Sequence, residues 1–393
     1  MKKYIIFMIT VIFSFTLLNV YSKEDEDSTP IAKLKLVKGT VFVQKFETEK
    51  KISAKQDMKL YPEDMIITEK DGECTILYKN ESLLKVSPES QIKINEVVDE
   101  EEDSNSIICF IGQIIAKIKK GSNQKFEVMT PTAVVGVRGT EFMVATGEDG
   151  ASLVGVMDGT VEVENENEKK IKIGKGEKVE IEYNAKMRKG KGFQYNKFNR
   201  REWMRKRREF FIKHKDKILK YIDKRFNRFE KTYNLIEKRI NRLEQQRARI
   251  LKDMRIARER SDQKQLMKLR NQLRKNYIQF VRTTRGLRKL NSRFIGNVRI
   301  LKRFNRIPQF KKFEERYAAR FKRIRNIQQK LHKNIRKDYL KRRKILKEYR
   351  KHLIKRKYRK ERMKHPKPKL KERKEKGMMP PRKGRGRARG RRR

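Results

Sequence analysis

The chain has 393 residues, of which 39% are charged, and its formal net charge is +57. Residues 24–185 contain 22 basic and 32 acidic residues, whereas residues 186–393 contain 81 basic and 17 acidic ones. This asymmetry argues against one uniform domain and predicts an acidic module and a basic module with different partners.

Residues 1–22 are predicted to be an export signal. Lys2 and Lys3 precede an apolar run from Tyr4 to Leu18, and the small residues around Ser22 suit cleavage. The run is shorter than the roughly twenty residues that comfortably span a bilayer. We therefore expect an exported protein of the periplasm or cell envelope, with an uncleaved N-terminal membrane anchor as the alternative. No second apolar run of membrane length follows.

Residues 30–185 show short apolar runs with a period of two, separated by turn residues. Asp71-Gly72 and Asp158-Gly159 are typical hairpin turn signals. The pattern predicts an all-β sandwich or roll of short strands, and about 150 residues are enough to bury one core.

The central motif of this module runs from Thr130 to Phe142. Gly136 and Gly139 are expected to allow a kink that β-branched neighbours would not tolerate. Arg138, between them, is expected to donate to nearby carbonyls or to Glu141. The motif predicts a structural corner without catalytic chemistry. Its residues are Thr130, Pro131, Gly136, Arg138, Gly139, Thr140 and Phe142.

Cys74 and Cys109 are the only cysteines, and both lie in the acidic module. An even pair in an oxidising compartment invites a disulfide, but the strands that carry the two cysteines need not be neighbours. We therefore favour two buried thiols, with the disulfide as the alternative. The histidines are isolated on the basic half, which argues against a metal site. They are His214, His332, His352 and His365.

Several segments of the acidic module resemble the FecR domain. They are Glu63–Thr68, Asp71-Gly72, Leu83–Ile92, Phe126–Phe142, Gly155–Val163 and Gly174–Glu177. The resemblance implies an extracytoplasmic β-rich domain that recognises another protein. In the best-known members it relays a signal from an outer-membrane receptor to a sigma factor.

Two features depart from that family. Glu63 stands where the family usually has a glycine, which predicts an altered turn. The apolar run begins at residue four, which leaves no cytoplasmic segment for a sigma factor. A stand-alone exported FecR-domain protein is therefore the expectation.

The basic module is predicted to be helical. After a linker at residues 186–199, apolar residues recur every three or four positions from Ile222 to Ala257, from Leu266 to Leu301 and from Phe310 to Tyr339. Ser261-Asp262 and Pro308 interrupt the pattern. We predict a long antiparallel coiled coil within residues 200–362, whose apolar seam also permits self-association.

The outer faces of these helices are nearly all Lys and Arg, which predicts binding to an anionic envelope surface or polymer such as lipid head groups or acidic glycans. Nucleic acid and a purely solvated coiled coil are the alternatives. Residues 363–393 have the composition of a disordered basic tail. The tail residues expected to contact a polyanion are Arg385, Arg387, Arg389, Arg391, Arg392 and Arg393.

No enzyme motif is present in the sequence: it has no phosphate-binding loop, no Gly-x-Ser-x-Gly turn and no His-Glu-x-x-His helix. We therefore predict a non-enzymatic protein without a cofactor. Its β domain would recognise an envelope protein, and its basic helices would hold a polyanion. The alternatives are a membrane-anchored FecR-type regulator and a nucleic-acid-binding protein.

Overall fold

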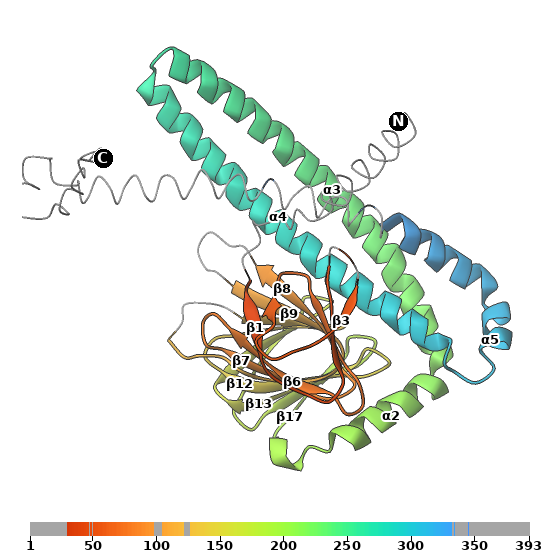
Figure 1. Cartoon of the computed structure of the whole chain (residues 1–393). Coiled ribbons are helices and arrows are strands. Elements are labelled where there is room, and N and C mark those ends of the chain that lie inside the picture. Colours follow the sequence, from red (N-terminus) through yellow and green to blue (C-terminus); the bar gives the residue numbers. More distant parts are fainter. Residues whose placement is uncertain are drawn as a thin grey trace, which may run out of the picture. The chain divides into compact units, whose positions relative to one another are not determined.

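A computed structural model describes residues 30–46, 48, 50–97, 104–121, 126–331, 334 and 345 (Figure 1). The chain divides into two compact units, residues 1–333 and residues 334–393. The predicted export signal and the arginine-rich tail lie outside the described residues. An all-β region is followed by long helices, which confirms the predicted fold class.

The all-β region is a two-layered sandwich whose strands are short. In chain order they are β1 (Ala32–Lys38), β2 (Val41–Gln44), β3 (Lys51–Ser53), β4 (Lys59–Leu60), β5 (Met65–Thr68), β6 (Glu73–Tyr78), β7 (Leu83–Val86), β8 (Gln91–Val97), β9 (Ser104–Lys117), β10 (Phe126–Met129), β11 (Ala133–Val137), β12 (Glu141–Thr146), β13 (Ser152–Asp158), β14 (Thr160–Asn165), β15 (Lys170–Gly174), β16 (Lys178–Ile181) and β17 (Met187–Gly190).

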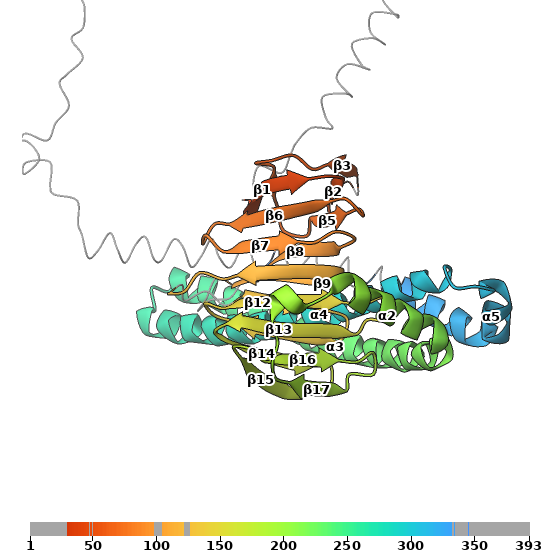
Figure 2. The same ribbon diagram turned by 90° about the horizontal axis from the view of Figure 1, so that it is seen from below.

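The pairings arrange these strands in two sheets that share β9 (Figure 2). One sheet has the order β4-β1-β6-β7-β9-β12-β13-β16-β17. The other has the order β3-β2-β5-β8-β9-β10-β11-β14-β15. All of these pairs are antiparallel except β9 with β10.

Strand β9 passes from one sheet to the other at Gly112. Before this glycine, Ile107 and Cys109 face the core, and after it Ile114 and Ala116 do, so the inward positions change from odd to even numbers. Gly112 has a φ of 102°, and a Cβ there would come within 2.1 Å of the Ser90 hydroxyl. Only glycine fits this bend.

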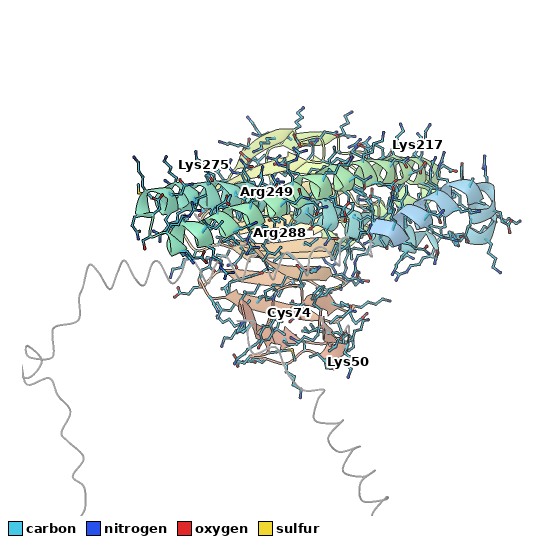
Figure 3. All side chains as sticks on the ribbon, turned by 90° about the horizontal axis from the view of Figure 1, so that it is seen from above. Lys50, Cys74, Lys217, Arg249, Lys275 and Arg288 are labelled. Atoms are coloured by element: carbon cyan, nitrogen blue, oxygen red, sulfur yellow. The ribbon has the colours of Figure 1, made fainter. Side chains whose placement is uncertain are left out.

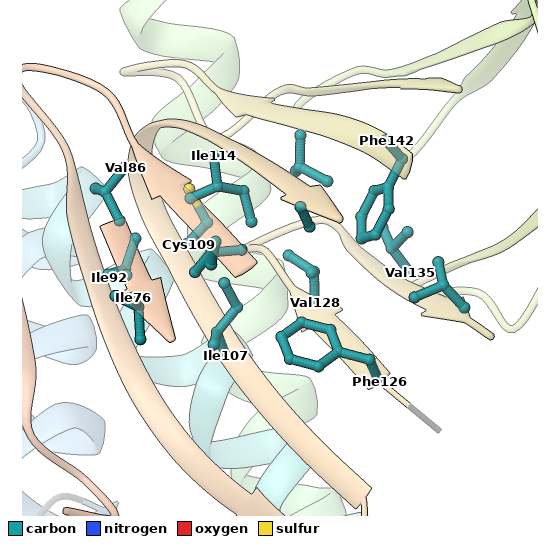
Figure 4. Close-up of a cluster of buried hydrophobic side chains, with 14 of the residues drawn as sticks. Ile76, Val86, Ile92, Ile107, Cys109, Ile114, Phe126, Val128, Val135 and Phe142 are labelled. Carbon is teal, nitrogen blue, oxygen red and sulfur yellow. The ribbon is translucent and has the colours of Figure 1, made fainter. Parts of the chain in front are cut away.

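The core lies between the two sheets and consists mainly of Ile, Val and Leu. Strands β6, β7, β9, β10 and β12 contribute side chains such as Ile76, Val86, Phe126 and Phe142, which are fully or almost fully buried (Figure 4). Ring packing of Phe126 against Tyr78, with centroids 5.3 Å apart, adds to this core. Burial at this scale provides the main stabilisation of the sandwich.

The helical part begins with the one-turn helix η1 (Tyr195–Lys197), followed by α2 (Arg200–Lys213), α3 (Lys215–Glu259), α4 (Gln263–Phe304) and α5 (Phe310–Arg316). Residues 318–331 are helical as well. Helices α3 and α4 form an antiparallel hairpin, from which basic side chains such as Lys217, Arg249 and Lys275 project (Figure 3). Asp262 caps α4 by accepting from the Gln265 amide at 2.8 Å, as Ser261-Asp262 predicts.

Residues 310–331 pack back along the first half of α3. The Tyr317 hydroxyl donates to Asp216 at 2.6 Å, and Lys330 lies 2.8 Å from Glu230. Between these contacts Asp223, with only 7% of its side chain exposed, pairs with Arg320 and Arg323. The three acidic residues are seven positions apart, so they form one row along α3.

Two sequence expectations need correction. Strand β17 lies within the predicted linker 186–199, because Met187–Gly190 pair with β16 and extend the sandwich. The predicted coiled-coil region also begins with two separate helices, because α2 ends at Lys213 and α3 begins at Lys215, with His214 between them. Among the described helices, none combines the length and the apolarity needed to cross a bilayer.

Candidate functional site

The Thr130–Thr132 turn joins β10 to β11 and is buried. The Thr130 hydroxyl accepts from the Ala133 amide at 2.9 Å and from the Ser152 hydroxyl at 2.8 Å. The Thr132 hydroxyl lies 3.0 Å from the Gly150 carbonyl and 2.9 Å from the Ser152 hydroxyl. These short buried hydrogen bonds fix the turn to β13.

The corner that follows connects the two sheets. Gly139 adopts a φ of 58°, and the Thr140 hydroxyl lies 3.0 Å from the Arg138 carbonyl and 3.1 Å from the Thr160 carbonyl. Arg138 itself is exposed. Glu141 forms an ion pair with Lys117, and the two charged atoms are 3.8 Å apart.

The predicted kink at Gly136 is wrong. Gly136 lies inside β11, where it pairs with Glu127 of β10 and Glu162 of β14. Phe142 is buried in the core from β12. The motif is therefore a hairpin followed by a sheet-changing corner at Gly139, with a strand that the sequence analysis missed between them.

Helix α4 covers this turn. A Cβ on Gly296 would lie 2.9 Å from Cγ of Pro131, and a Cβ on Gly150 would lie 2.5 Å from Cδ1 of Ile300. Beside them, Ile295 packs against the outward-facing residues Ile108, Phe110, Met129 and Val134. This second apolar layer explains why β10 and β11 are buried on both faces.

Two arginines of α4 reach into the sandwich edge. Arg303 donates to the carbonyls of Glu148 at 2.6 Å and Phe110 at 3.2 Å. Burial lowers the pKa of its guanidinium to about 10. Arg299 lies over the Phe110 ring at 4.6 Å and donates to Gln91, and burial also lowers its pKa.

A third buried arginine, Arg225 of α3, links three segments. It donates to Glu166 at 2.7 Å, to Asn297 of α4 at 3.0 Å and to the Tyr183 carbonyl at 2.7 Å. The side chains of Arg225 and Glu166 are 2% and 4% exposed. The Tyr221 hydroxyl donates to Glu166 at 2.8 Å, and burial together with the Glu166 charge raises the pKa of Tyr221 to about 12.

Further ion pairs extend this contact along α4 and α2. Arg285 lies 3.2 Å from Glu127, Lys289 lies 3.1 Å from Glu164, and Arg207 pairs with the buried Asp149. The acidic charge of the β module is therefore used in part to bind the chain's own basic helices. The charge asymmetry of the sequence had predicted separate partners for the two modules.

These buried arginines were not anticipated, since the helical cations were assigned to a solvated outer face. One signal was available. Gly296 lies inside the predicted helix although glycine disfavours helices, which indicates a close approach of another element.

Glu63 combines a left-handed backbone with a buried ion pair. Glu63 has a φ of 76°, the left-handed region in which a glycine is favoured. Its carboxylate forms an ion pair with Lys93, and the two side chains are 4% and 8% exposed. The Lys93 ammonium also lies 5.6 Å from the centre of the Phe46 ring.

Cys74 of β6 and Cys109 of β9 are buried free thiols, as we favoured, and the alternative disulfide is not formed. Burial raises the pKa of each thiol to about 12. Within the described residues, no three His, Cys, Asp or Glu side chains come together as metal ligands would.

Comparison with known proteins gives one family match, to the FecR protein family over residues 64–162. No curated protein matches the chain. Two crystal structures of a candidate anti-sigma factor from Parabacteroides distasonis, at 1.65 and 2.50 Å resolution, show 18% identity and TM-scores of 0.29 and 0.28. Each match covers 32% of this chain and 59% or 57% of that one, so the chain spans less than two thirds of that protein. The family match lies within the β-sandwich and shows that its residues 64–162 are similar to the FecR family.

Proposed function

We propose that this chain is an exported, non-enzymatic adaptor of the cell envelope. Its FecR domain recognises another envelope protein, and its basic helical hairpin binds an anionic polymer or surface. The FecR family match supports the recognition role, and the apolar run after Lys2 and Lys3 supports export.

The observation that carries the binding role is the composition of α4. This helix has thirteen Lys and Arg residues and no Asp or Glu. Its inner cations, such as Lys289 and Arg303, are satisfied by the FecR domain. Cations nearer the start of α4, such as Lys268 and Arg270, are exposed and have no partner among the described residues. Uncompensated cations along one helix attract polyanions and repel one another until one binds.

Binding of the full chain to a sulfated glycan, to anionic vesicles and to single-stranded DNA would test this role. We expect micromolar or tighter binding that weakens steeply as the salt concentration rises from 50 to 300 mM. Absence of salt-dependent binding to all three would refute the proposal. Preference for DNA would favour the nucleic-acid alternative.

The second candidate function is a membrane-anchored signalling regulator, which the FecR family match also favours. Cell fractionation with N-terminal sequencing separates the two. A mature N-terminus near Lys23 in the periplasmic fraction supports the adaptor. An intact Met1 in the inner membrane supports the regulator.

A further inference from the structure

A groove of about 360 Å³ runs between α3 and α4 towards the loop that connects them. Its floor contains Ile250 of α3. Its rim carries one cation from each helix, Arg249 and Lys275, both drawn in Figure 3. Both side chains are exposed, and neither has a hydrogen-bond or ion-pair partner among the described residues.

Amide side chains supply the remaining polar groups of the groove. Gln246, Gln272 and Gln279 line it and are exposed. An amide offers both a donor and an acceptor, which matches the alternating carbonyls and N–H groups of a peptide backbone. The groove therefore combines an apolar floor, amides and two opposed cations.

The groove lies on the side of the hairpin that faces the FecR domain. On α3, Arg228 and Arg249 are three heptads apart, and so are Arg225 and Gln246, so each pair occupies one face of the helix. Arg225 and Arg228 both pair with Glu166. The row that begins at Arg228 also contains Leu235, whose exposure of 69% is unusual for leucine.

The same relation holds on α4. Lys275 lies two heptads before Lys289, which pairs with Glu164 of β14. Gln279 lies two heptads before Arg293, which donates to the Asn165 carbonyl at 3.2 Å. The groove thus continues the surface that already binds an acidic polypeptide, the FecR domain of the same chain.

We propose that the groove between α3 and α4 binds a carboxylate-rich segment of a partner protein. Arg249 and Lys275 hold two of its carboxylates from opposite sides, the glutamines bind its backbone, and Ile250 contacts its apolar groups. This inference rests on the proposed polyanion-binding function and specifies its site and its ligand. A polypeptide is favoured over a glycan or nucleic acid because the neighbouring positions of the same rows bind Glu164 and Glu166 side chains and a peptide carbonyl.

Fluorescence anisotropy with the full chain tests the site, using a fluorescein-labelled oligoglutamate peptide and an oligoglutamine peptide of equal length. We compare R249E/K275E with the charge-matched control K252E/R274E. Lys252 and Arg274 are also exposed, and neither lines the groove. We expect the groove variant to weaken oligoglutamate binding by about tenfold or more and the control by less than about threefold. The oligoglutamine peptide should not bind.

Three outcomes would overturn the inference. Equal losses in both variants would mean diffuse attraction, which leaves the proposed polyanion-binding function intact. Binding of a sulfated glycan or DNA but not of oligoglutamate, with loss in R249E/K275E, would assign the groove to a different ligand class. Sedimentation showing a dimer that R249E/K275E abolishes would assign it to a second copy of this chain. Only the absence of all polyanion binding would refute the proposed function as well.

Discussion

Gly296 of α4 lies directly against Pro131 of the β10–β11 turn, so close that a Cβ at position 296 would come within 2.9 Å of the proline Cγ and 3.2 Å of its Cα. This approach brings the helix over the buried turn at Thr130–Thr132. A partner that required access to this turn would first have to displace α4.

The first prediction concerns this contact. Replacing Gly296 by Val should separate α4 from the turn and lower the free energy of unfolding by about 2–3 kcal/mol, as overpacking does. Gly286→Ala is the control, because its Cβ would meet only Cδ1 of Ile236 at an ordinary 3.8 Å. That change should stabilise the protein by about 0.5–1 kcal/mol through helix propensity. Urea unfolding measures the free energy of unfolding of both variants. Equal changes in the two variants would contradict the close approach of Gly296 to Pro131.

The second prediction concerns the pair formed by Arg225 and Glu166. Both side chains are almost completely buried. Glu166→Gln should therefore lower the free energy of unfolding by about 3 kcal/mol, because it leaves a buried guanidinium without its counter-charge. Arg225→Met should cost a similar amount. The double variant should lose clearly less than the two single losses added together. Strict additivity in urea unfolding would show that the two groups do not interact.

The third prediction concerns Glu63 and its ion pair with Lys93. Glu63→Gly should relieve about 1 kcal/mol of left-handed backbone strain. It should nevertheless destabilise the protein, because it leaves the buried Lys93 unpaired at a cost of about 3 kcal/mol. The double variant E63G/K93M removes both the strain and the charge, and we expect it to recover most of the loss. A stabilised single variant would contradict the importance of the pair.

The extent to which the sequence predicted this structure differs between its parts. The heptad spacing predicted the helices, and Ser261-Asp262 predicted the connection between two of them, because helix periodicity and capping are local properties. The strand Ala133–Val137 was missed because burial on both faces removes the period-two alternation. The buried roles of Arg225 and Arg303 depend on contacts with residues far along the chain, which no local pattern specifies.

The fourth prediction contrasts two acidic residues of the row along α3. Asp223 is buried beneath Arg320 and Arg323, so Asp223→Asn should weaken the packing of residues 310–331 by about 2–4 kcal/mol. Glu230, 30% exposed and paired with the 56% exposed Lys330, should contribute at most about 1 kcal/mol when changed to Gln. In limited trypsin digestion, the Asp223→Asn variant should be cleaved faster between residues 305 and 325 than the Glu230→Gln variant. Equal rates in the two variants would contradict it.

The last prediction concerns the pH dependence that the two buried thiols impart. Burial raises the pKa of Cys74 and Cys109 from 9.0 to about 12. Between these values the unfolded chain loses its thiol protons and the native chain keeps them. The two buried thiols therefore do not lower the free energy of unfolding below pH 9. As the pH rises from 9 towards 12, the free energy of unfolding falls.

At pH 10.5 each thiol should lower the free energy of unfolding by roughly 2 kcal/mol relative to its value below pH 9, because one pKa unit corresponds to about 1.4 kcal/mol. Urea unfolding at pH 8, 9.5 and 10.5 measures how the free energy of unfolding falls with pH. The variant C74A/C109A should be less stable at pH 8, but its free energy of unfolding should fall less steeply as the pH rises. An aromatic disulfide reagent should leave both thiols unmodified in the native protein and modify both in urea. Rapid modification of the native protein, or equal pH slopes for the two proteins, would show that the thiols are not buried as described.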